Sequence, residues 1–258
     1  MNFTIFSLQG LLLGVTFFFS GVIDAVCGGG GLLSMPMYMA VGFPAHYVTG
    51  TNQCSIFFGG VTSLLRYMRG GHIHWPTALI TGPLAVLGAF LGAKLNLILP
   101  ERALEIIMVL LIPVAAAVIL TKRNFGDENH VDEISARRKW LGALVIGLVI
   151  GVYQGFYGAG SGAFFMLGFC LIHRLDLTKA SGNTKFVAFC ANLSSAATFA
   201  FSGMVVWPAV LLATVFNVVG SYIGAGLAMK KGAKVIRPMF LFVLALLFVR
   251  LLSTVFGG

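Results

Sequence analysis

The sequence predicts an all-α integral membrane protein made of two inverted repeats, each a broken or re-entrant helical hairpin followed by three transmembrane helices. Three observations predict this fold: an apolar composition, long apolar runs between short polar loops, and an internal repeat. Hydrophobic residues make up 58% of the 258 residues and charged residues 10%, with a mean hydropathy of +0.95. This composition leaves too little polar surface to cover a soluble protein.

The apolar runs have the length of membrane helices, because a hydrocarbon core of ~30 Å takes about 20 helical residues. The sequence lacks the short alternating segments of a membrane β-barrel. The first run has no basic region or cleavage site before it, so we expect it to be retained. We expect membrane helices over residues 8–26, 47–66, 76–98, 103–121, 140–157, 180–201, 207–228 and 235–254, with shorter helices over 32–41 and 162–171.

Two stretches of the chain resemble each other. The segment LGAFLGAKL at 87–95 resembles VGSYIGAGL at 219–227, and the Trp-Pro pair at 75–76 recurs at 207–208. Transporters are often built from such repeats, with the substrate site at the interface between them. We therefore expect a first membrane repeat over 1–121, a cytoplasmic linker over 122–139 and a second membrane repeat over 140–258.

Lysine and arginine predict how the chain is oriented. Thirteen of these seventeen residues lie in loops 66–74, 122–139, 171–179 and 229–237. Short basic loops stay on the cytoplasmic side, so both termini are predicted outside and equivalent loops of the two halves face opposite ways. The net charge of +9 follows from this bias. We expect a multi-pass protein of the bacterial plasma (inner) membrane that contacts the lipid bilayer and no nucleic acid.

Each half begins with a hairpin that turns at glycines, CGGGG at 27–31 and YGAGS at 157–161. The return arm over 162–171 spans only about 15 Å as a helix, half of a bilayer. Non-helical backbone at that depth must be buried by protein or line a watery cavity. Two such turns facing each other would point backbone N–H groups and helix dipoles at an anion.

Helix packing is the other explanation for glycine, because small residues let membrane helices approach closely. The chain has 33 glycines. We interpret Gly88, Gly92, Gly220 and Gly224 as packing residues. The run of four consecutive glycines exceeds what a packing face needs, and we interpret it as functional.

Polar residues follow each hairpin, in TGTNQCS at 49–55 and ASGNTKF at 181–187. We align Asn52 with Asn183, which places Lys185 where the first half has Cys54. Lys185 is the only basic residue that we place within the hydrocarbon. Burying it is costly unless it faces a partner or a cavity, so we expect it to contact the anion.

Asp24 is the only acidic residue that we place in a membrane interior, and Gln154 stands at its repeated position. Two roles stay open for its carboxylate. It could bind a coupling proton, or it could accept hydrogen bonds from backbone N–H groups of the turn.

These motifs resemble a known family. GVIDAVCGGGGLLSMP followed by GTN, and GFYGAGSG followed by Lys-Phe and a later Asn, look like the sulfite exporter TauE/SafE family of anion transporters over essentially the whole chain. The resemblance implies export or uptake of sulfite, sulfonates or other small organosulfur anions. By position it implicates these residues in substrate binding: Gly28, Gly29, Gly30, Gly31, Thr51, Asn52, Gln53, Gly158, Gly160, Ser161, Asn183, Lys185 and Asn192.

One departure from the family pattern concerns charge. Where we expect Thr-Asn-Lys in the first half, this chain has Thr51-Asn52-Gln53. One fixed positive charge in place of two argues against a dianion as the substrate.

Three other functions are weighed against this one: a transporter of another small anion such as a carboxylate, a cation transporter and an intramembrane enzyme. A cation site would need several inward carboxylates, and the predicted spans contain one. The spans contain no paired carboxylates, no metal-ligand cluster and no nucleophile beside a base. We predict no enzyme activity, no cofactor and no metal. The exact substrate, the direction of transport, the coupling ion and a homo-oligomeric state stay open.

Overall fold

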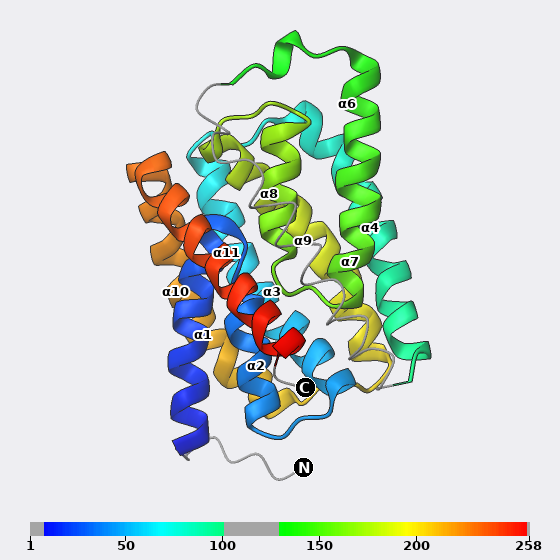
Figure 1. The fold of residues 1–258 in the computed structure, drawn as a ribbon, viewed down its shortest axis with the longest axis vertical. Coiled ribbons are helices and arrows are strands. Elements are labelled where there is room, and N and C mark those ends of the chain that lie inside the picture. The colour runs from blue at the N-terminus through cyan, green and yellow to red at the C-terminus, as the bar shows by residue number, and fades with distance from the viewer. Residues whose placement is uncertain (1–7, 101–128, 257–258) are drawn as a thin grey trace.

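A computed structural model describes residues 8–100 and 129–256, and within these ranges the chain forms helices and loops without a β-strand (Figure 1). Each half opens with a hairpin of two helices. The hairpin of the first half consists of α1 (Leu8–Cys27) and α2 (Gly31–Ala40). The hairpin of the second half consists of a long arm, formed by α6 (Ala136–Ala143), the π-helical segment η2 (Leu144–Val149) and α7 (Ile150–Phe156), and the return helix α8 (Ser161–Leu171).

Long helices follow each hairpin: α3 (Ala45–Arg69) and α4 (Trp75–Ile98) in the first half, and α9 (Leu177–Phe201), α10 (Trp207–Lys231) and α11 (Ala233–Phe256) in the second. A short 3-10 helix, η1 (Val131–Glu133), precedes α6. The predicted helices are confirmed except for 103–121, which lies outside the described residues. The π-helical segment is a departure from the regular helix that the sequence predicts over 140–157.

Four of the described helical segments are long and apolar enough to cross a membrane: α1, α4, the arm from α6 to α7, and α10. Helices α3 and α9 have 25 residues each, about 37 Å at 1.5 Å per residue. They are less apolar because each carries buried polar side chains, Thr51 and Lys185 among them. These buried polar residues face the protein interior.

Proline and aspartate determine where three of the long helices begin. Pro76 and Pro208 lie in the first turns of α4 and α10, where a missing N–H leaves no hydrogen bond unmade. The carboxylate of Asp176 accepts hydrogen bonds from the backbone N–H groups of Thr178 and Lys179 at the start of α9. This is a standard N-cap.

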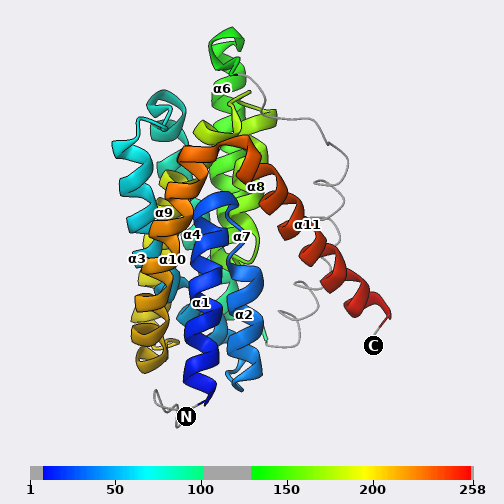
Figure 2. The same cartoon turned by 90° about the vertical axis from the view of Figure 1, so that its left-hand side faces the viewer.

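The basic loops lie at one end of the molecule. The connections that follow α3, α8 and α10 are at the upper end of Figure 1, and α6 begins there. The start of α1 and the connections from α2 to α3 and from α9 to α10 lie at the opposite end. Helix α11 starts beside the end of α10 and descends on the side where α2 and α8 lie (Figure 2).

The two halves interlock, because the first arm of each hairpin packs on a long helix of the other half. Helix α1 packs along α10, and α7 packs along α4. A Cβ added at Gly220 of α10 would overlap Phe18 of α1, and one added at Gly92 of α4 would overlap Val152 of α7. A Cβ added at Gly88 or Gly224 would also overlap backbone atoms of the other half. Their interpretation as packing residues is confirmed.

Candidate functional site

The two glycine-rich turns are in direct contact. Gly28, Gly158 and Gly160 have φ angles of +77°, +82° and +77°, a region that favours glycine. A Cβ added at Gly28 would overlap the backbone of Gly162, and one added at Gly162 would overlap the backbone of Gly28. The structure therefore brings together the end of α1 and the first turn of α8.

The run of four glycines is closely packed in this conformation. An added Cβ would come within 3.0 Å of protein atoms at every one of the four positions. The neighbours are Gly162 at Gly28, Val243 at Gly29, Ser20 and Asp24 at Gly30, and Ala159 at Gly31. The described residues thus fill the space that we expected a substrate to use. A ligand reaches this backbone only if the packing around the turns loosens.

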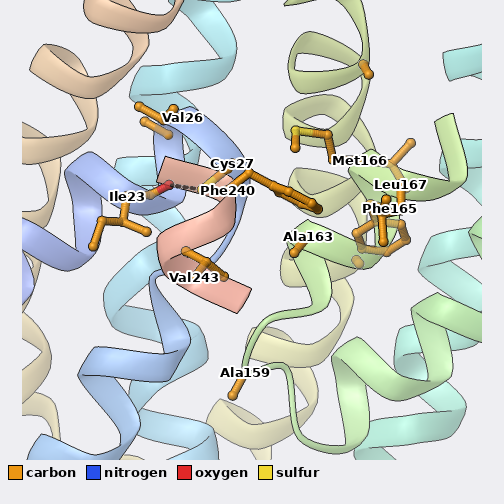
Figure 3. Close-up of a cluster of buried hydrophobic side chains, with 14 of the residues drawn as sticks. Ile23, Val26, Cys27, Ala159, Ala163, Phe165, Met166, Leu167, Phe240 and Val243 are labelled. Atoms are coloured by element: carbon orange, nitrogen blue, oxygen red, sulfur yellow. Dashed lines mark hydrogen bonds between the residues drawn. The ribbon is translucent and has the colours of Figure 1, made fainter. Parts of the chain in front are cut away.

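Helix α11 covers the first turn. Figure 3 shows Phe240 beside Cys27 at the end of α1, with its ring extending toward α8, and Val243 one turn further along α11. The side chains of Cys27, Phe240 and Val243 are buried. The turn between α1 and α2 therefore has apolar protein on this side.

An ion pair joins α1 to α9 beside this turn. Nζ of Lys185 lies 2.8 Å from Oδ2 of Asp24, and the two side chains are 2% and 22% exposed. One turn earlier on α9, the Ser181 hydroxyl donates to the carbonyl oxygen of Val26 at 3.0 Å. The buried position expected for Lys185 is confirmed. Asp24 has a partner that the sequence interpretation did not consider, since its carboxylate accepts from an ammonium group.

A neutral contact joins α3 of the first half to α7 of the second half. Nε2 of Gln53 donates to the backbone oxygen of Gln154 at 2.7 Å. The side chain of Gln154 in turn donates to Asn192 and accepts from the Ser161 hydroxyl. Within the described residues, Oε1 of Gln53 is buried and has no hydrogen-bond partner. Gln154 is not among the predicted substrate-binding residues, but it connects three residues that are: Gln53, Ser161 and Asn192.

Two other predicted binding residues hold helix ends. Oγ1 of Thr51 accepts from the backbone N–H of Val206 at 3.0 Å, just before α10. Oδ1 of Asn183 accepts from the backbone N–H of His74 at 2.7 Å, just before α4. The structure places both side chains at connections between helices rather than at the glycine turns.

These two hydrogen bonds correct the register of the internal repeat. Because Thr51 and Asn183 make the same contact, Asn183 corresponds to Thr51 and not to Asn52, and Lys185 corresponds to Gln53 and not to Cys54. The predicted alignment was one residue out, since the short motifs share too few residues to fix it. Asn52 instead accepts a hydrogen bond from the Ser34 hydroxyl of α2, at 2.6 Å.

Asn183→Ala is expected to lower stability by about 1–3 kcal/mol, because it leaves the part-buried backbone N–H of His74 without its acceptor and removes one of the hydrogen bonds of the Thr77 hydroxyl. Thermal unfolding of the purified protein measures the effect. Thr62→Ala is the control, since Thr62 is half-buried and bonds only within its own helix. Equal unfolding temperatures for the two variants would show that Asn183 does not hold α4 in place.

Comparison with known proteins agrees with the sequence motifs. A profile of the family described as Sulfite exporter TauE/SafE matches residues 13–251. A probable membrane transporter protein, ORF9 of Sinorhizobium sp, is 36% identical over 239 residues, covering 93% of this chain and 90% of the relative. The probable membrane transporter protein YfcA of Escherichia coli strain K12 is 29% identical over 255 residues, covering 96% and 93%. No solved structure gives a significant match.

Proposed function

The chain belongs to the sulfite exporter TauE/SafE family of membrane transporters, and we propose that it moves a small sulfur-containing anion, such as sulfite or a sulfonate, across the bacterial inner membrane. The anion is held next to Lys185 where the two glycine-rich turns meet. The relatives described above are named only as probable membrane transporters, so the substrate is argued from this site.

One observation carries the proposal: a lysine that is 2% exposed lies beside the contact between two broken helices. A buried ammonium group is costly in a membrane protein, and such groups commonly mark substrate pathways. Helix α8 begins at Ser161, and its N-cap residue Gly160 makes no side-chain hydrogen bond. The N–H groups of Ser161 and Ala163 bond to backbone carbonyls of the turn, so the helix adds to the attraction of an anion through the positive end of its dipole.

The charge of the site favours a monoanion. Lys185 supplies one positive charge, and the corresponding residue in the first half is the neutral Gln53. A site with a single lysine leaves one charge of a dianion without a counter-charge, which is unfavourable away from water. We therefore expect sulfonates and singly charged sulfite to bind more tightly than sulfate.

Transport requires the packed turns to separate, because protein atoms fill the space at Gly28 to Gly31 in this conformation. We infer that the repeats are inverted and that the two hairpins move apart in turn, each from its own side of the membrane. The basic loops at one end of the molecule support this arrangement, as does the reciprocal packing of α1 on α10 and α7 on α4.

The orientation can be tested by labelling. A cysteine placed before Asn2 or after Gly258 should react with an impermeant thiol reagent applied to intact cells, because both termini are predicted outside. A cysteine placed in the linker 122–139 should not react until the cells are opened. Labelling of the linker with protection of the termini would overturn the inverted orientation.

Transport itself can be measured in proteoliposomes. Purified protein should take up radiolabelled sulfite in a saturable manner, and unlabelled methanesulfonate should compete with it more strongly than sulfate or acetate. Uptake that is equal to that of protein-free liposomes, or that acetate alone inhibits, would contradict a sulfur-containing anion as the substrate.

A further inference from the structure

Lys185 needs a negative partner at every stage of a transport cycle. Its side chain is 2% exposed, and a buried charge left unpaired is strongly destabilising. When a substrate anion leaves the site, another anion must replace it beside the ammonium group. In the structure, the anion beside the ammonium group is the carboxylate of Asp24, at 2.8 Å.

We propose that Asp24 is an internal anion that competes with the substrate for Lys185. Its carboxylate pairs with the ammonium group when no substrate is bound and is displaced when the substrate binds. This inference rests on the proposed function. It adds a specific step, the exchange of one carboxylate for one substrate anion at a single lysine.

The geometry allows Asp24 to be the member of the pair that moves. Its side chain is 22% exposed, against 2% for Lys185, so protein atoms confine the carboxylate less than they confine the ammonium group. Asp24 also lies in the last turn of α1, directly before the glycine turn, and glycine gives that backbone freedom to rearrange. The lysine, by contrast, projects from the middle of the 25-residue helix α9.

Helix stability does not explain the aspartate. The C-terminal end of a helix carries a partial negative charge that favours cations and disfavours carboxylates. A carboxylate in the last turn of α1 is therefore unfavourable for that helix taken alone. Its pairing with Lys185 offsets this cost.

Helix packing does not explain the charges either. At the corresponding place between the two halves, Gln53 and Gln154 join α3 to α7 by a hydrogen bond between neutral groups. Gln53 corresponds to Lys185 in the corrected register, and Gln154 corresponds to Asp24 in the repeated hairpin. Uncharged residues thus suffice to connect α3 to α7. The charged pair between α1 and α9 is therefore not needed for helix packing alone, and we assign its charges to anion exchange.

The Asp24→Asn variant distinguishes two roles for Asp24: exchange with the substrate anion and positioning of Lys185. If Asp24 competes with the substrate, removing its charge should tighten the binding of sulfite or methanesulfonate at least tenfold, measured by calorimetric titration of the purified protein. Turnover in proteoliposomes should fall, because the bound anion has no internal replacement. If Asp24 only positions Lys185, the variant should bind these anions no better than wild type, and exchange would be wrong.

Two further variants distinguish this inference from the proposed function. Lys185→Met and the double variant Asp24→Asn, Lys185→Met should bind both probes equally weakly, since neither retains the ammonium group. If Lys185→Met binds the anions more weakly than wild type but Asp24→Asn does not bind them more tightly, the proposed exchange is wrong and the proposed site stands. If Lys185→Met binds as well as wild type, the proposed site fails as well.

A measurement on the wild-type protein covers the case in which Asp24→Asn does not fold. Infrared difference spectra recorded on addition of methanesulfonate should show a shift in a carboxylate stretching band, because Asp24 exchanges an ammonium partner for water. Glu133 is exposed and distant in sequence from the site, so Glu133→Gln should leave the band unchanged. A binding spectrum without any carboxylate shift would overturn the exchange.

Discussion

Replacing Lys185 with methionine is expected to weaken the binding of sulfite and sulfonates at least tenfold and to stop their transport. Methionine keeps much of the apolar volume of the side chain but removes the positive charge. An ammonium group paired with an anion away from water forms a charge-assisted hydrogen bond, and each tenfold change in affinity corresponds to about 1.4 kcal/mol. Calorimetric titration of the purified variant measures the affinity, and proteoliposome uptake measures transport.

Lys94→Met is the matched control. Lys94 is an exposed lysine on α4, so this variant loses the same net charge without touching the site. Its affinity and uptake should equal those of the wild type. Equal losses in both variants would point to the overall charge of the protein and would argue against a specific site at Lys185.

Gly28→Val is expected to prevent the protein from folding. Gly28 has a φ angle of +77°, which is strained for a β-branched residue, and its added Cβ would overlap the backbone of Gly162. Gly162→Ala isolates the second effect, because an alanine there meets the backbone of Gly28 in an ordinary helical conformation. Both variants should lose the monodisperse peak in size-exclusion chromatography, Gly28→Val more completely.

Gly60→Val provides the control for this pair. A Cβ at Gly60 of α3 would meet nothing within 4 Å, so valine there should be tolerated. Gly30→Val is not a test of substrate contact, because a side chain at Gly30 would collide with Ser20 of α1. If Gly28→Val and Gly162→Ala fold as well as Gly60→Val, the two turns are not in contact in the native protein.

Much of the fold could be predicted from the sequence because membrane helices have simple signals. Apolar length gave the long helices, and the glycine runs at 27–31 and 157–161 gave the turns of both hairpins. The π-helical segment over 144–149 could not be predicted, since its sequence, LVIGLV, is compatible with a regular helix. The sequence analysis predicted that the two turns face each other, but it did not predict the direct contact between Gly28 and Gly162.

The pairing of Asp24 with Lys185 was missed for a different reason. The two residues are 161 positions apart, and each was interpreted alone. Asp24 was interpreted as a proton site or as an acceptor for backbone N–H groups, and Lys185 as a substrate contact. A signal was available, because opposite charges within a membrane protein usually pair. The neutral contact between Gln53 and Gln154 carried no such signal, and it became recognisable only once Thr51 and Asn183 had fixed the register of the repeat.

The most direct test of the account is a calorimetric titration of the purified wild-type protein with methanesulfonate, sulfite, thiosulfate, sulfate and acetate. A site with one buried ammonium group and backbone N–H donors should bind methanesulfonate or sulfite saturably, and sulfate and acetate at least tenfold more weakly, a difference of about 1.4 kcal/mol. Tightest binding of acetate, or no saturable binding of any sulfur-containing anion, would contradict it.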